Sequence, residues 1–107
     1  MVKDFDTTIE KYLDLIRGQF SGIERVFLFG SYAKGKYTDD SDIDIALIFA
    51  KLDDSERFEV QVRLMMLASQ IDSRIEPHPI SNEDFHSGNP FVAEIKRTGI
   101  EIGSQTQ

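Results

Sequence analysis

The spacing of apolar residues along the chain predicts its helices and strands. Near the amino terminus apolar side chains recur every three or four residues, which predicts a helix over about 5–20; they are Phe5, Ile9, Tyr12, Leu13, Ile16 and Phe20. The run IERVFLF at 23–29 is rich in β-branched and aromatic residues and stops at Gly30, which indicates a buried strand. Ser31 then suits the N-cap of a short helical turn over 32–34.

The middle of the chain predicts a second strand and a long helix. A polar turn at 35–41 precedes the strand at 42–49, and the helix begins with a cap at 53–55 and ends near Gln70. The apolar residues of this helix are Phe58, Val60, Val62, Leu64, Met65, Met66, Leu67 and Ala68. Because they cover more than one stripe, the helix is either buried on two sides or offers a face to a partner, which could also be a second copy in a homo-oligomer.

The segment SRIEPHPI at 73–80 predicts a third strand. It alternates apolar and polar residues, but Pro77 and Pro79 cannot donate ladder hydrogen bonds, so it is an edge strand at best. Ser81 suits the cap of a short turn that runs through Phe85.

The end of the chain completes a small α/β pattern. Pro90 opens a last helix that Gly99 ends, a short strand follows at 100–102, and the residues at 103–107 look frayed. The order of elements predicts one α/β (α+β) domain over 1–107, with a small mixed sheet and helices packed mainly on one face. The other face would be open, and a site could lie there.

The composition narrows the classes of protein. The 107 residues suffice for one hydrophobic core, contain no cysteine, and hold no apolar run approaching the ~20 residues that span a bilayer. The amino-terminal stretch lacks the pattern of a signal peptide, so we expect a cytoplasmic protein without a membrane span. The net charge of −7 argues against direct binding to a nucleic-acid backbone, which favours basic surfaces.

Asp42 and Asp44 open an otherwise apolar strand. Side chains alternate across a strand, so the two carboxylates share one face and lie roughly 6.5–7 Å apart along the backbone. Carboxylates that converge repel each other, and a divalent cation such as Mg²⁺ removes that repulsion. An isolated Asp-x-Asp pair also occurs at solvated strand ends, so the pair alone does not identify a metal site.

The turn formed by Gly30 and Ser31 strengthens the metal interpretation. Gly30 lets a ligand approach the backbone closely, and the free N–H groups of the helical turn at Ser31 suit a phosphate. If the two strands are neighbours, the turn and the acids lie at the same end of the sheet. Phosphates at Ser31 could then be bridged by metal to Asp42 and Asp44, whereas the simpler interpretation of Ser31 is an ordinary helix cap.

The combined pattern resembles the minimal nucleotidyltransferases of the DNA polymerase beta-like superfamily. GSYAKG at 30–35 and SDIDI at 41–45 are similar to its GSxARG and SDxDL motifs, and NPF at 89–91 is similar to the sequence before its last helix. The resemblance implies the polymerase beta-like nucleotidyltransferase fold. It also implies a two-metal reaction that transfers a nucleotide to a hydroxyl and releases pyrophosphate.

The resemblance assigns roles to individual residues. Those that would bind two Mg²⁺ ions and act in catalysis are Asp42, Asp44 and Glu76. Those that would contact the nucleotide, ATP, are Gly30, Ser31, Lys34 and Ser41. The family more often has aspartate at the position of Glu76 and arginine at that of Lys34, whose ammonium lacks the planar fork that grips phosphate.

The resemblance also implies a partner. Such proteins commonly pair with a small helical HEPN-domain toxin and silence it by transferring AMP from ATP to a tyrosine, which makes them antitoxins. The apolar helix over 58–68 fits a need for a partner, and the alternative is a module that neutralises a helical partner by binding alone. His78 could touch the metal site or the nucleotide, but we favour a strand-edge residue. Tyr32 or Tyr37 could stack on a base or face a partner, but we favour exposed aromatic residues of the turn.

Overall fold

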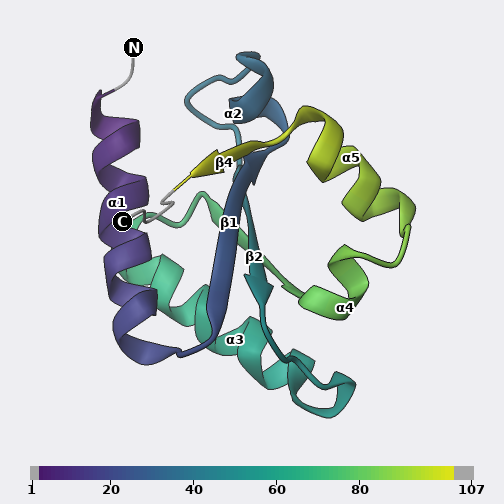
Figure 1. The fold of residues 1–107 in the computed structure, drawn as a ribbon. Helices are drawn as coiled ribbons and strands as arrows, with labels where there is room; N and C mark the ends of the chain where they lie inside the picture. The colour runs from purple at the N-terminus through teal and green to yellow at the C-terminus, as the bar shows by residue number, and fades with distance from the viewer. Residues whose placement is uncertain (1–2, 103–107) are drawn as a thin grey trace.

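The computed structural model describes residues 3–102, with side chains described from residue 7 onward, and contains one mixed sheet with helices on both sides (Figure 1). Its elements are α1 Lys3–Gln19, β1 Ile23–Phe29, α2 Ser31–Lys34, β2 Ile43–Phe49, α3 Asp54–Ile71, β3 Ile75–Ser81, α4 Asn82–Phe85, α5 Pro90–Thr98 and β4 Ile100–Ile102. The strand order is β3-β2-β1-β4, with β3 parallel to β2 and the other pairs antiparallel. The predicted mixed α/β sheet is therefore confirmed.

The predicted elements are all present, and most of the predicted boundaries hold. Asp53 caps α3 in a capping box with Glu56, whose side chain accepts a hydrogen bond of 3.0 Å from the Asp53 backbone. Ser81 caps α4, since its hydroxyl accepts a 3.0 Å hydrogen bond from the backbone of Asp84. The predicted strand with two prolines is indeed an edge strand, β3. The predicted core position Phe5 and the segment 103–107 lie outside the described side chains.

The cap predicted at Ser31 is wrong. Ser31 is the first residue of α2, and Gly30 occupies the N-cap position with φ 75° and ψ −150°. A residue with a β-carbon is strained at such a positive φ, so glycine serves where serine was expected. Ser31 lies exposed.

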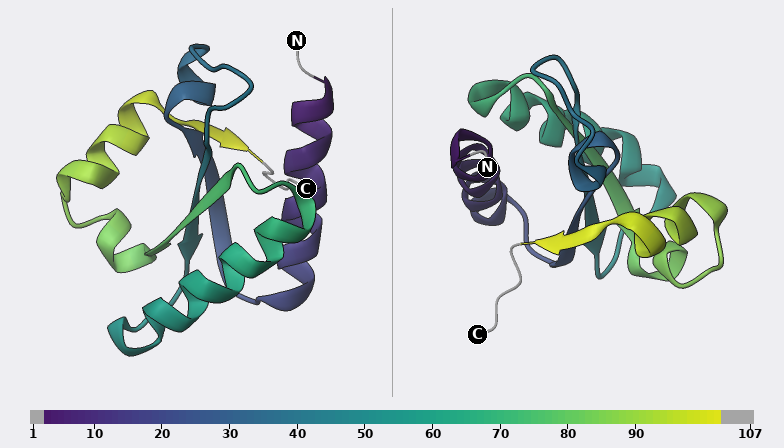
Figure 2. Two further views of the ribbon diagram at one scale, coloured as in Figure 1. Left: turned by 180° about the vertical axis from the view of Figure 1, so that it is seen from behind. Right: turned by 90° about the horizontal axis from the view of Figure 1, so that it is seen from above.

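The two long helices cover one face of the sheet. Alternating residues of β2 pack against α1 and α3 in a buried cluster that contains Ile16, Leu47 and Leu64. Seen from above, α1 and α5 lie on opposite sides of the sheet (Figure 2). The second face was expected to be open, but α4 and α5 cover part of it, with Phe85 and Ile95 packed on the intervening residues of the strands. The uncovered end of this face is where Asp44 lies.

The outer side of α3 remains exposed. Only Leu64 and Ala68 of this helix are fully buried, whereas Phe58, Val62, Met65 and Met66 are exposed, Phe58 to 79% of its surface. The described residues thus bury α3 on one side only, and a partner on its outer face stays a prediction. Among the described residues, no helix combines the length and apolar character needed to cross a bilayer.

A buried hydrogen bond joins the two long helices. The hydroxyl of Tyr12, on α1, donates to the backbone carbonyl of Leu64, on α3, over 2.9 Å, and the Tyr12 side chain is fully buried. Burial raises the pKa of the Tyr12 hydroxyl, because the charged phenolate would lose its hydration. The hydroxyl is therefore a neutral donor that fixes α1 against the helix that leads to β3.

Replacing Tyr12 with phenylalanine should lower the free energy of unfolding by about 1 kcal/mol, the net value of a buried hydrogen bond. The rings are alike, so the loss reports the hydroxyl alone. Urea unfolding of the wild type and the variant measures it. An equal midpoint with an unchanged slope would show that the hydrogen bond gives no net stability.

Candidate metal and nucleotide site

The parallel pairing of β2 with β3 gathers three metal-ligating side chains at one end of the sheet. Asp44 lies opposite Glu76 in the register, and Ala46, two residues on, lies opposite His78. Because residues two apart share a face, the three side chains lie on the same side of the two strands. Each offers one ligand atom, and these atoms all lie within 4.8 Å of one another. Asp44 and His78 are partly buried, and Glu76 is the most exposed of the three.

The Gly30 turn lies directly against this cluster. A β-carbon built on Gly30 would stand 2.5 Å from Oδ2 of Asp44, which is closer than any real contact allows. The backbone of the turn and the carboxylate of Asp44 are thus in contact because Gly30 has no side chain. In the register, Phe29, just before the turn, pairs with Asp44. The structure therefore brings together the turn and the second aspartate, as the sequence analysis expected for neighbouring strands.

Asp42 and Ser31 lie at the exposed rim. Asp42 immediately precedes β2, which begins at Ile43, and its side chain is exposed. It is not one of the three donors that converge among the described residues. The alternation argument holds only within the strand, so a shared face for Asp42 and Asp44 stays a prediction. Ser31 is exposed, and its carbonyl accepts a 3.0 Å hydrogen bond from the backbone of Lys36, which closes the turn.

Lys34 and Ser41, the other predicted nucleotide contacts, have partners within the chain. Nζ of Lys34 lies 4.0 Å from Oε2 of Glu94, on α5. The hydrogen bond that Glu94 accepts from Arg97 lowers the pKa of the Glu94 carboxyl. Both Lys34 and Glu94 are exposed, so this ion pair is weak and open to exchange for a ligand. The hydroxyl of Ser41 accepts a 2.9 Å hydrogen bond from the backbone of Thr38 and holds the turn before β2.

Arg74 fastens the loop between the turn and β2, a role that the sequence analysis missed. Its Nη1 donates to the hydroxyl of Tyr32 over 3.0 Å and to the carbonyl of Asp39 over 3.1 Å. Its Nε and Nη2 bind Asp72 over 3.1 and 2.8 Å, and this pairing lowers the pKa of Asp72. One planar guanidinium thus connects three chain segments, and only the folded structure brings those segments together.

Tyr32 and Tyr37 form a stacked pair rather than two exposed aromatic residues of the turn. Their ring centroids are 4.2 Å apart with an angle of 4° between the planes, and Tyr32 is 7% exposed. Tyr32 also accepts the hydrogen bond from Arg74. The stack and the guanidinium hold α2 in place, so the turn at Gly30 is presented to the site as a fixed surface.

His78 joins the cluster, although the sequence analysis favoured it as a simple strand-edge residue. Its Nε2 lies 3.2 Å from Oδ1 of Asp44. Its ring packs edge-on against Phe29 with centroids 5.1 Å apart, and lies 5.9 Å from the ring of Phe91. The signal for this position was the spacing of two from Glu76, but only the strand register shows which neighbours it meets.

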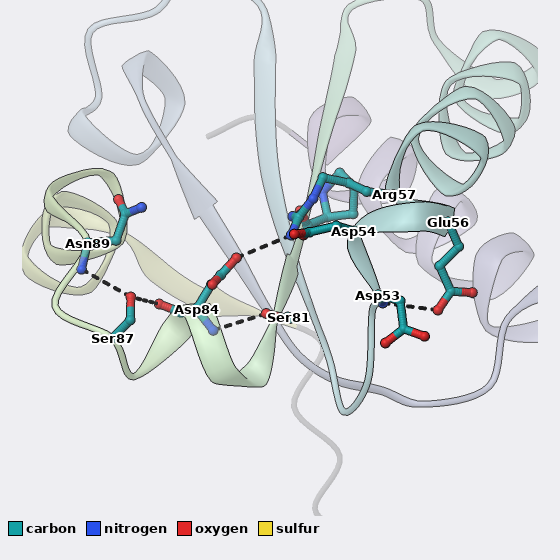
Figure 3. Close-up of polar contacts among 9 residues, drawn as sticks. Asp53, Asp54, Glu56, Arg57, Ser81, Asp84, Ser87 and Asn89 are labelled. Atoms are coloured by element: carbon teal, nitrogen blue, oxygen red, sulfur yellow. Dashed lines mark hydrogen bonds and ion pairs between the residues drawn. The ribbon is translucent and has the colours of Figure 1, made fainter.

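A cavity of about 220 Å³ adjoins the cluster on the side of His78. Residues from four elements line it, among them Arg57 and Gln61 of α3 and Phe91 of α5. Arg57 reaches across from α3 to Asp84, to which it donates over 3.2 Å (Figure 3). Carboxylate oxygens beside a glycine turn suit a hard cation such as Mg²⁺ together with phosphate, so the donors present fit the metal that the sequence analysis expected.

Comparison with curated proteins finds relatives of named function. Protein adenylyltransferase MntA of Shewanella oneidensis is 37% identical over 67 residues, which are 62% of this chain and 46% of that protein. Another relative, from Methanocaldococcus jannaschii, is 39% identical over 44 residues, which are 40% of this chain and 44% of that protein. The chain thus spans less than half the length of these two curated relatives.

Solved structures share the fold. A toxin–antitoxin complex with AMP-PNP contains a chain that is 27% identical, with a TM-score of 0.61, and the match covers 94% of this chain and 74% of that one. The MNT antitoxin in complex with the tri-AMPylated HEPN toxin of Shewanella oneidensis gives a TM-score of 0.60 at 20% identity, over 94% of this chain and 72% of that one.

The family comparison covers nearly the whole chain. The family described as polymerase beta, nucleotidyltransferase matches residues 9–107. That range includes the turn at Gly30, Asp42, Asp44 and all of β3. With the sheet, the turn and the converging acids in place, this chain belongs to the polymerase beta nucleotidyltransferase family.

Proposed function

We propose that this domain is a Mg²⁺-dependent protein adenylyltransferase. It transfers AMP from ATP to a hydroxyl, that of a tyrosine, on a HEPN-type toxin and so acts as its antitoxin. The observation that carries the proposal is the contact of the Gly30 backbone with the Asp44 carboxylate, beside Glu76. It is the arrangement that a nucleotidyltransferase needs, because phosphate and metal ligands must meet at one point.

Asp42, Asp44 and Glu76 are the residues that would hold the metal ions in this proposal. Two bound Mg²⁺ ions would neutralise charge on the triphosphate and favour ionisation of the acceptor hydroxyl. The donor set includes two carboxylates that already converge, Asp44 and Glu76, and the exposed Asp42 stands one residue before β2. Convergence without a cation is repulsive, so the arrangement itself favours cation binding.

The turn and its flanks would hold the nucleotide. Gly30 leaves room for a phosphate against the backbone, and the exposed Ser31 offers its N–H and hydroxyl as donors. Lys34 can leave its exposed ion pair with Glu94 to bind a phosphate oxygen. In the reaction the acceptor oxygen forms a bond to the α-phosphorus, the bond from that phosphorus to the bridging oxygen breaks, and pyrophosphate leaves with the electron pair. The hydroxyl proton passes to solvent.

The acceptor would be brought by the partner. The exposed apolar residues of α3, namely Phe58, Val62, Met65 and Met66, are the surface on which we place the helical partner. The relatives support this reading, because one is named protein adenylyltransferase and solved neighbours are toxin–antitoxin complexes, one with AMP-PNP. The same surface also favours the second candidate, a module that neutralises its partner by binding without chemistry.

Replacing Asp44 with asparagine should lower AMP transfer roughly 100-fold or more, because the neutral amide cannot balance the metal charge. The measurement incubates the chain with Mg²⁺, labelled ATP and the small helical protein encoded beside it, and follows the label on that protein. Asp14→Asn, an exposed acid on α1, is the control and should label like the wild type. If the Asp44→Asn variant labels the partner as strongly as the wild type, the proposal is wrong. If the chain neutralises the partner without labelling it, the binding module is favoured.

Replacing Gly30 with alanine should reduce AMP transfer roughly 100-fold, since the new methyl group would displace the Asp44 carboxylate. Gly22→Ala is the matched control: Gly22 has φ 88° against 75° for Gly30, but nothing lies within 4 Å of its added β-carbon. Both variants should lose stability from the positive φ, Gly30→Ala by about 1–3 kcal/mol because φ 75° with ψ −150° is a region that only glycine adopts readily. If the two lose activity equally, backbone strain and not the contact with Asp44 is the cause.

Changing Phe58 and Met66 together to serine should weaken binding of the helical neighbour protein at least ~10-fold, because buried apolar anchors commonly supply more than 1 kcal/mol each. Isothermal titration with that protein gives the dissociation constants. Ile100→Ser, which changes an apolar residue of β4 that is 48% exposed, should leave the affinity unchanged. An unchanged affinity in the double variant would place the partner on another surface.

A further inference from the structure

The position of His78 carries an inference about which metals the site accepts. This inference rests on the metal site of the proposed function. A ring nitrogen of His78 is one of the three ligand atoms that lie within 4.8 Å of one another, and the other two belong to Asp44 and Glu76. The cluster thus offers a nitrogen donor beside two carboxylates, whereas the sequence pattern predicted only oxygen donors.

The separation of His78 and Asp44 suits two ligands of a single ion. Nε2 of His78 and Oδ1 of Asp44 are 3.2 Å apart. Two ligands with bonds of about 2.1 Å to one ion are about 3.0 Å apart in octahedral geometry and about 3.4 Å apart in tetrahedral geometry. The observed distance falls between these values. A hydrogen bond alone would also fit this distance, but Glu76 offers a third ligand atom within reach of the same point.

The orientation of the imidazole is fixed by its neighbours. Phe29 of β1 meets the ring edge-on at a centroid distance of 5.1 Å, and Phe91 of α5 lies at 5.9 Å. Phe29 and Phe91 also contact each other at 5.6 Å, so the three rings support one another. His78 is therefore a donor whose direction is set before a metal arrives, and this lowers the entropic cost of ligation.

We propose that His78 is a metal ligand, and that its imidazole makes the site bind first-row transition divalents more tightly than Mg²⁺. Imidazole nitrogen favours ions such as Co²⁺, Ni²⁺ and Zn²⁺, whereas Mg²⁺ strongly prefers oxygen donors. Asp44 and Glu76 supply the oxygens that either class of ion accepts. The selectivity of the site then depends on one residue of β3.

Co²⁺ is the probe, because its visible absorption reports the ligands directly. Isothermal titration of Co²⁺ and of Mg²⁺ into the wild-type chain, without nucleotide or partner, gives both affinities. His78→Gln keeps an oxygen donor of similar reach, and His86→Gln changes the other histidine, which is exposed and bonded to the carbonyl of Asn82. Circular dichroism verifies that each variant is folded.

The wild type should bind Co²⁺ at least tenfold more tightly than Mg²⁺. His78→Gln should weaken Co²⁺ binding roughly 10–100-fold, shift the Co²⁺ absorption and leave Mg²⁺ binding within a few-fold. His86→Gln should match the wild type. If a folded His78→Gln variant binds Co²⁺ as tightly as the wild type with the same absorption, His78 only holds Asp44 by a hydrogen bond and the inference is wrong.

The inference and the proposed function fail separately. Metal binding is measured without ATP or an acceptor, so loss of Co²⁺ binding on changing His78 supports the ligand role even if no AMP is transferred. Conversely, transfer with Mg²⁺ in a chain that shows no preference for Co²⁺ overturns the inference and leaves the adenylyltransferase proposal standing. A wild type that binds neither ion in the absence of nucleotide also overturns it, since the three protein donors should suffice.

Discussion

The parallel pairing of β2 with β3 is the interaction on which the rest of the site depends. Its register sets Asp44 opposite Glu76 and places His78 one step along the same face. A slip of one residue would turn both β3 side chains to the opposite face, where α1 and α3 pack. A parallel pair also needs a long crossover, and α3 supplies it with 18 residues.

The same helix protects the edge that this pairing leaves. Gln61 donates to the carbonyl of Pro77 over 2.9 Å, and Arg57 reaches the carbonyl of Pro79 at 3.5 Å. Proline has no backbone N–H. At these two positions the outer edge therefore has no free donor, and its carbonyl acceptors are already bonded to α3. An edge so finished is a poor template for another strand.

Each face of the sheet carries its own hydrophobic cluster. One face carries the large cluster with α1 and α3, in which the buried hydroxyl of Tyr12 joins the helices. The other carries a smaller cluster with α4 and α5, and it stops short of the end where Asp44 lies. Arg74 and the stack of Tyr32 on Tyr37 hold the loop at that end of the sheet. The charged residues of the site are therefore positioned by a well-packed core.

The sequence by itself determined the elements and the kind of chemistry. Periodicity and turn residues are local signals, so they were enough for the helices, the strands and the edge position of β3. The Gly-Ser turn and the acids Asp42 and Asp44 were identified by residue type and spacing. Even the misplaced cap at Ser31 concerned only which residue of the turn takes the positive φ.

Only the tertiary structure decided which of these side chains meet. Three contacts join residues that lie 14 to 42 positions apart in the chain: Gly30 with Asp44, Arg74 with Tyr32, and His78 with Asp44. No local pattern encodes such distances, because strand register and helix packing set them through the burial of the whole core. The sequence could name donors for a metal, but the parallel pairing determined that one of those gathered is a nitrogen.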